Sequence, residues 1–141
     1  MTPAQVELVQ DSFVKVAPIA EQAAALFYGR LFEIAPEVRS LFDGDMTEQG
    51  RKLMATLAVV VNGLASLDAI LPAASALAKR HVAYGVTPGH YAPVGEALLW
   101  TLERGLGAGW TQDLAAAWAA AYATLSQFMI GEAYSRPIAA E

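Results

Sequence analysis

Apolar residues recur at helical spacing along almost the whole chain, and no stretch shows the alternating pattern of a strand. Caps, prolines and glycines divide this pattern into seven or eight predicted helices with short connections, without a repeat or a linker. We expect one all-α domain over residues 1–134 and a frayed tail over 135–141. Periodicity leaves two architectures open: an ordinary helical bundle, or helices crossing steeply around a cofactor pocket.

Local signals place several helix boundaries. Thr2 and Pro3 indicate the first helix, and Pro18 is predicted to open the second. The turn over residues 43–45 predicts that Thr47 starts the next long helix. Residues 67–84 form one helix or two that join near Pro72. Gly85 fits the end of that segment.

The composition excludes several classes of protein. Charged residues are 16% of the chain, the apolar set is 55% and the formal charge is −5, so a nucleic-acid partner is not expected. There is no cysteine, which excludes disulfides and thiolate metal sites. The longest wholly apolar stretch, residues 114–123, is far below the ~18 residues of a membrane span. We expect a soluble, cytoplasmic protein without a signal peptide or a membrane partner.

His81 lies near the end of an apolar helical segment, and the only other histidine is His90. A single imidazole in an all-helical chain can hold a haem iron from one side. The alternative for His81 is a last-turn histidine that complements the helix dipole. His90, in the first turn after Pro88, is better interpreted as a partly exposed turn histidine.

Two polar side chains fall on faces that should point inward. Tyr28 shares its face with Leu31 and Phe32, so its phenol needs a hydrogen-bond partner or a ligand. Gln49 lies one helical turn before Leu53, and its amide has several hydrogen-bonding positions to satisfy. Both residues are candidates for a ligand site.

Together these residues resemble the globin family, and within it the bacterial single-domain globins related to the haem domain of flavohaemoglobins. The resemblance covers roughly residues 1 to 133. It is carried, in this order, by Phe27-Tyr28-x-x-Leu31-Phe32-x-x-x-Pro36, Phe42, Gln49-x-x-x-Leu53, His81-x-x-x-Gly85, Tyr91-x-x-x-Gly95 and Trp118-x-x-x-Tyr122. It implies a globin fold of seven to eight helices, three over three, that encloses a haem b pocket.

The resemblance also implies roles for individual residues. His81 resembles the proximal iron ligand, and Phe42 the phenylalanine that wedges the porphyrin. On the opposite, distal side, Tyr28 and Gln49 resemble the pair that meets the gas ligand, with Leu53 as their apolar neighbour. Such a pair can donate hydrogen bonds to dioxygen, so tight binding with slow release is expected.

Further residues complete the implied site. Lys52 and Arg80 are candidate partners of the haem propionates, or else solvated helix charges. Tyr91 matches a tyrosine beside the proximal histidine. Glu132 is the candidate glutamate that polarises His81, but it lies ten residues after Tyr122 where the family pattern has eleven. One residue turns a helical side chain by about 100°, which leaves the contact in doubt.

Three functions remain open at this point. The first is NO dioxygenation, or peroxidase-like chemistry, with electrons from a separate reductase. The second is reversible binding of O2, with NO and CO as further ligands, for storage or sensing. The third, from another class, is a haem-free helical interaction module. The oligomeric state is not predicted.

Overall fold

The structure is a computed structural model, and it describes residues 1–42 and 44–134. Within these residues there is no strand, and the helical elements include both α-helices and short 3₁₀ segments. In chain order they are α1 (Pro3–Val16), η1 (Ala17–Ile19), α2 (Ala20–Ile34), η2 (Pro36–Leu41), α3 (Met46–Asn62), η3 (Leu64–Ser66), α4 (Leu67–Ala83), η4 (Pro88–His90), α5 (Tyr91–Leu106), η5 (Gly107–Gly109) and α6 (Gln112–Tyr134). The predicted tail, 135–141, lies outside the described residues.

Most helix starts follow from local chemistry. The Thr2 hydroxyl accepts a hydrogen bond from the Gln5 amide, and the Gln5 side chain accepts one from the Thr2 amide, so the two residues form a capping box. The prediction for α3 was one residue late: the helix begins at Met46 because the Asp45 carboxylate accepts from the Thr47 amide at 2.9 Å.

Two other helix boundaries are known only from the structure. Pro18 lies in the 3₁₀ segment η1, and α2 begins two residues later at Ala20. Residues 67–83 form one helix, α4, with Pro72 inside it near the N-terminal end. Pro72 is the sixth residue of α4, so it removes the N–H that would donate to the Asp68 carbonyl, and the helix nevertheless continues through it.

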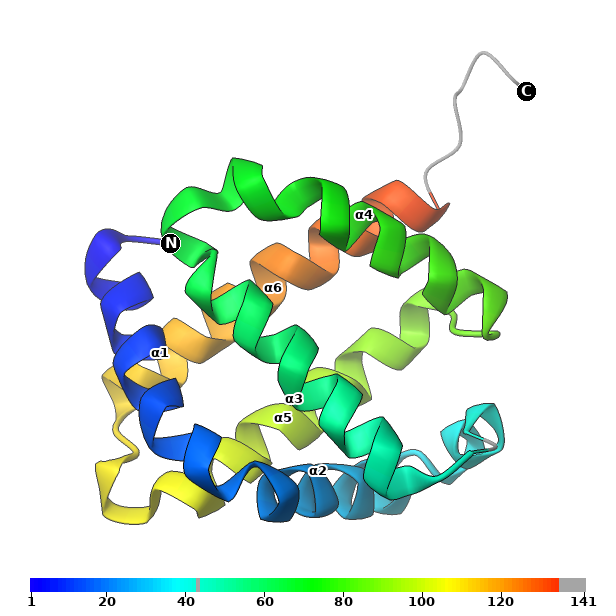
Figure 1. Ribbon diagram of the computed structural model, residues 1–141, viewed down its shortest axis with the longest axis horizontal. Coiled ribbons are helices and arrows are strands. Elements are labelled where there is room, and N and C mark those ends of the chain that lie inside the picture. The colour runs from blue at the N-terminus through cyan, green and yellow to red at the C-terminus, as the bar shows by residue number, and fades with distance from the viewer. Residues whose placement is uncertain (43, 135–141) are drawn as a thin grey trace.

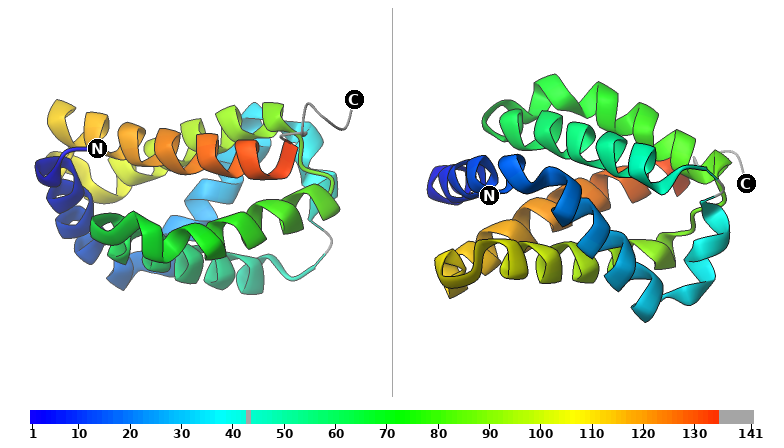
Figure 2. Two further views of the ribbon diagram at one scale, coloured as in Figure 1. Left: turned by 90° about the horizontal axis from the view of Figure 1, so that it is seen from above. Right: turned by 60° about the horizontal axis from the view of Figure 1, so that its bottom comes forward.

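The helices pack in crossed layers. Figure 2 shows α3 and α4 on one side of the molecule and α5 and α6 on the other. The strongest contacts join α2 to α5, α4 to α6, α1 to α6 and α2 to α3, whereas α3 and α4 make little contact with α5. Figure 1 shows α3, α4, α5 and α6 around the centre of the molecule. This arrangement favours helices that cross around a pocket over an ordinary bundle.

α6 is long and apolar enough to cross a membrane by length and composition alone. Its inner face packs against α1, α4 and α5. Trp118 at its centre is 2% exposed and donates its indole N–H to the Ser12 hydroxyl of α1 at 2.9 Å. The inner face of α6 is therefore packed into the core of the domain.

The buried core of the described residues is divided into three clusters. The first joins α1, α3 and α6 around Val9 and Trp118. The second joins α2, η2 and α5 around Phe27 and Ala97. The third joins α4, α5 and α6 around Ala78. A domain of this size usually has one continuous core, so its buried residues are more divided here than is usual.

Candidate functional site

Tyr28 lies among aromatic rings near the C-terminal end of α2. It is 7% exposed. Its ring meets Phe27 and Phe42 edge to face, with ring centroids 5.0 and 5.3 Å apart, and lies parallel to Phe32 at 6.0 Å. Phe42, which follows η2, thus reaches the same cluster as the phenol. These rings fix the orientation of Tyr28.

Gln49 reaches Tyr28 from the first turn of α3. Burial raises the pKa of the Tyr28 phenol above its usual value, and a hydrogen bond with the Gln49 side chain partly offsets this rise. Leu53, one turn further along α3, is half-buried and packs against the cluster that contains Tyr28. The structure therefore brings together the predicted distal residues Tyr28, Gln49 and Leu53, and it places Phe42, the residue predicted to wedge the porphyrin, in the same cluster.

His81 lies in the last turn of α4 and is half-buried. Its Nδ1 is 2.8 Å from the Leu77 carbonyl oxygen, one turn earlier. A carbonyl only accepts, so Nδ1 carries the proton and donates. The other nitrogen, Nε2, has no hydrogen-bond partner among the residues that the structure describes. His81 is thus held in the tautomer that presents Nε2 to a metal.

Tyr91 lies beside His81, as predicted. The two rings are nearly parallel, at 29°, with centroids 6.5 Å apart. The Tyr91 carbonyl accepts a hydrogen bond from the Tyr122 hydroxyl at 2.5 Å, and the Tyr122 ring packs directly on Gly95. The Tyr91-x-x-x-Gly95 and Trp118-x-x-x-Tyr122 motifs therefore form one contact between α5 and α6.

Glu132 is held away from the His81 ring. Its carboxylate accepts a hydrogen bond from the Ser75 hydroxyl at 2.7 Å. Ser75 precedes His81 by six residues, or about 9 Å along the helix axis. The sequence left a contact between Glu132 and His81 in doubt. In the structure Glu132 accepts a hydrogen bond from Ser75, and His81 donates one to the Leu77 carbonyl.

The remaining predicted residues lie at the surface. Lys52 and Arg80 are exposed, and neither forms an ion pair within the described part of the chain. Their role toward haem propionates stays a prediction. His90 accepts a hydrogen bond from the Thr87 amide at 3.0 Å and closes the turn before α5, in agreement with its interpretation as a turn histidine.

Sequence reasoning missed the two partners that organise the proximal side. A histidine in a helix can donate to the carbonyl four residues earlier, so the Leu77 carbonyl could have been anticipated from the helix alone. Ser75 could not, because its contact depends on the rotation of α6 against α4.

An all-helical fold with a helical histidine and a buried tyrosine–glutamine pair is what the resemblance to globins predicts, and comparison with known proteins agrees. The globin family profile matches residues 25–129, and the chain belongs to the globin family. A flavohemoprotein of Bordetella parapertussis is 37% identical over 108 residues, which cover 74% of this chain and 27% of the relative. One of Deinococcus radiodurans is 30% identical over 134 residues, which cover 93% and 33%.

The chain thus spans about a third or less of the length of these relatives. A bacterial globin structure from Campylobacter jejuni superimposes with a TM-score of 0.84 at 24% identity, over 94% of this chain and 96% of that one. This likeness confirms the all-α globin fold.

Membership of the globin family supports haem binding, and the described residues fit a haem. Apolar side chains at the edges of the three core clusters are only half-buried: Leu53, Leu57, Leu77, Val86, Val94 and Leu98. Across the molecule, η2 closes on the end of α4, where the Leu41 side chain lies against Gly85. An apolar plate inserted among these residues would cover them, and His81 supplies an imidazole nitrogen for its iron.

Proposed function

We propose that this globin holds dioxygen tightly at a haem b, through hydrogen bonds from Tyr28 and Gln49. The haem supplies an iron that His81 ligates and that binds diatomic gases. The observation that carries the proposal is the meeting of a buried phenol and an amide from two different helices. The phenol and the amide lie in an aromatic cluster, so they need a hydrogen-bonding ligand if all their donors and acceptors are to be satisfied.

The chain's own residues determine how such a ligand is held. Dioxygen at this site carries partial negative charge, and the Tyr28 O–H and a Gln49 N–H can both donate to it. The rings of Phe27, Phe32 and Phe42 surround the phenol with apolar groups, and hydrogen bonds are stronger in such surroundings than in water. Carbon monoxide carries less charge, so it gains less from the same pair.

On the other side, His81 presents a neutral imidazole. Its Nδ1–H donates a hydrogen bond to the Leu77 carbonyl, which is an uncharged acceptor. An uncharged acceptor leaves the ring without the strong anionic character that a carboxylate partner would give. This arrangement favours holding a gas ligand over cleaving its O–O bond.

The test is the rate of oxygen dissociation from the haem-loaded protein, measured by stopped flow. Tyr28→Phe should raise this rate by about one to two orders of magnitude, because a charge-assisted hydrogen bond contributes about 1.5–3 kcal/mol. Tyr84→Phe is the matched control, because Tyr84 is 62% exposed. An oxygen dissociation rate that Tyr28→Phe leaves unchanged would remove Tyr28 from this role.

NO dioxygenation is the second candidate, and the flavohemoprotein relatives favour it. In this reaction O2, NO and one electron combine to nitrate, so each turnover needs an electron from a separate reductase. A cytoplasmic location belongs to the same proposal. Stoichiometric nitrate on mixing the O2-loaded protein with NO, and repeated turnover with an added flavin reductase, would support it. Slow reaction with NO would leave oxygen binding as the function.

A further inference from the structure

A groove of about 480 Å³ runs between α2 and α3 on the outer side of their crossing. Small residues of α2 leave it open, and larger apolar side chains form its walls. Its lining combines apolar and small residues of both helices with Tyr28, and it also includes the exposed polar residues Glu21, Arg39, Thr47 and Arg51. A water molecule occupies about 30 Å³ of liquid, so molecules of that size have ample room.

The two helices touch at the floor of this groove. A Cβ on Gly50 would lie only 2.9 Å from the Ala24 Cβ, so the helices cross in close contact there. Tyr28, one turn after Ala24, both lines the groove and forms the pair with Gln49. One side chain therefore separates the groove from the distal side of the haem site.

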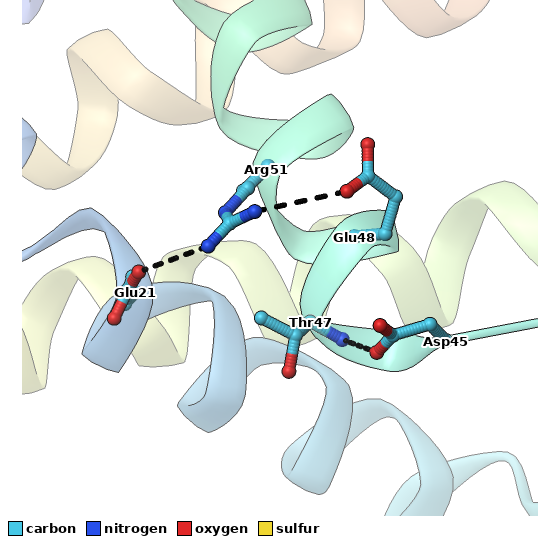
Figure 3. A network of polar contacts seen from close by, with 5 residues as sticks. All are labelled: Glu21, Asp45, Thr47, Glu48 and Arg51. Carbon is cyan, nitrogen blue, oxygen red and sulfur yellow. Dashed lines mark hydrogen bonds and ion pairs between the residues drawn. The ribbon is translucent and has the colours of Figure 1, made fainter.

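Charged residues lie at the rim. Arg51 of α3 reaches Glu21 of α2 at 3.8 Å, which links the two helices, and Glu48 of its own helix at 3.8 Å (Figure 3). All three side chains are more than half exposed. Exposed ion pairs are weak and their long side chains move within nanoseconds, so the rim does not seal the groove.

We propose that this groove between α2 and α3 is the route by which diatomic gases pass between solvent and the distal side of the haem site. The inference rests on the proposed function, because it takes Tyr28 to lie beside the bound gas. Dioxygen, NO and CO are small and apolar, and they partition from water into apolar surroundings. Apolar and small residues line the groove as far as the Tyr28 ring, and its charged and polar lining residues are all exposed.

A route has a kinetic signature that a binding contact lacks. Obstructing it raises the same barrier for a gas that arrives and for one that leaves. The association and dissociation rates then fall by one common factor, and their ratio, the affinity, does not change. Loss of a hydrogen bond to the bound gas instead raises the dissociation rate and lowers the affinity.

Gly29 provides the variant and α6 provides its control. Gly29 lines the groove, and a Cβ built on it meets no atom within 4 Å, so Gly29→Phe adds a ring to the groove without a clash at its base. Gly131 is also a helical glycine with open space at its Cβ, but it lies in α6 and away from the groove. Gly131→Phe therefore controls for the change of glycine to phenylalanine in a helix.

CO association after flash photolysis and CO dissociation by replacement with NO are measured on the haem-loaded proteins. We expect both rates to fall at least fivefold in Gly29→Phe, with an affinity within twofold of the parent and no change in Gly131→Phe. Unchanged rates in Gly29→Phe, or rates that change by different factors, would overturn the route. Tyr28→Phe, measured alongside, tests the proposed function separately because it changes oxygen dissociation whether or not the route is correct.

Xenon provides a readout that does not depend on ligand kinetics. Crystals of the parent protein under xenon pressure should show xenon between α2 and α3, beside Gly29 and Ala25. Ala25→Trp, a second lining substitution at an exposed position, should remove that xenon and slow CO as Gly29→Phe does. Xenon absent from the groove of the parent protein would overturn the proposal.

Discussion

The Ser75 hydroxyl donates a 2.7 Å hydrogen bond to the Glu132 carboxylate, which joins the middle of α4 to the end of α6. His81 lies further along α4, and its Nδ1–H donates a hydrogen bond to the Leu77 carbonyl. The acid that the family pattern would place beside the proximal histidine therefore serves the contact between two helices. Because Glu132 bonds to Ser75, the hydrogen bond from His81 goes to an uncharged carbonyl, which limits the electron density that His81 can donate to an iron.

Neutralising Glu132 should leave the iron–histidine bond unchanged. Glu132→Gln keeps an acceptor for Ser75 and removes the charge. Since His81 donates its hydrogen bond to the Leu77 carbonyl, we expect resonance Raman spectra of the reduced protein to show an unaltered iron–histidine stretching frequency. Stability should change by about 0.5 kcal/mol or less because Glu132 is exposed.

Glu96→Gln on α5, another exposed acid, is the matched control. A downward shift of the stretching frequency in Glu132→Gln alone would show that Glu132 polarises His81 after all. The peroxidase-like function would then regain support.

Gly95 is required by the ring of Tyr122. A Cβ on Gly95 would lie 2.5 and 2.8 Å from two ring carbons, and the ring is held by its hydrogen bond to the Tyr91 carbonyl. Gly95→Ala should destabilise the protein by about 1–3 kcal/mol in urea unfolding, as overpacking does. Gly131→Ala, with open space at its Cβ, should stabilise by up to about 1 kcal/mol because alanine favours a helix. Equal effects of the two substitutions would refute the steric account.

Oxygen release should not depend on pH over the neutral and mildly alkaline range. Burial raises the pKa of Tyr28, whose usual value is about 10, so the phenol keeps its proton up to and beyond pH 10. The stability that the neutral phenol contributes is fully present below pH 10 and is lost as the pH rises through the raised pKa. We expect a flat oxygen dissociation rate from pH 6 to 10. A rise centred below pH 10 would place an ionised phenol in the site.

The sequence predicted the helices well and their relative rotation poorly. Periodicity gave the all-α class, and local caps such as Thr2 act as expected. Asp45 and Thr47 were both plausible caps for α3, and intrinsic preference does not choose between them. Ser75 and Glu132 meet because of how α6 is turned against α4, which depends on the whole core. The α2–α3 groove likewise depends on the close approach of Gly50 to Ala24, which no pattern within either helix specifies.

Burial of Trp118 depends on a polar partner in another helix. Its indole N–H donates to the Ser12 hydroxyl at 2.9 Å, and Ser12 in turn donates to the Val9 carbonyl at 3.0 Å. Ser12→Ala leaves the buried N–H without this acceptor, so we expect a loss of about 1–3 kcal/mol in the free energy of unfolding by urea. Ser126→Ala is the control, since that buried hydroxyl bonds only weakly, at 3.3 Å, to a carbonyl of its own helix. It should cost no more than about 0.5 kcal/mol, because the higher helix propensity of alanine offsets the lost bond. Equal losses in the two variants would show that the Trp118–Ser12 bond does not contribute to holding α1 against α6.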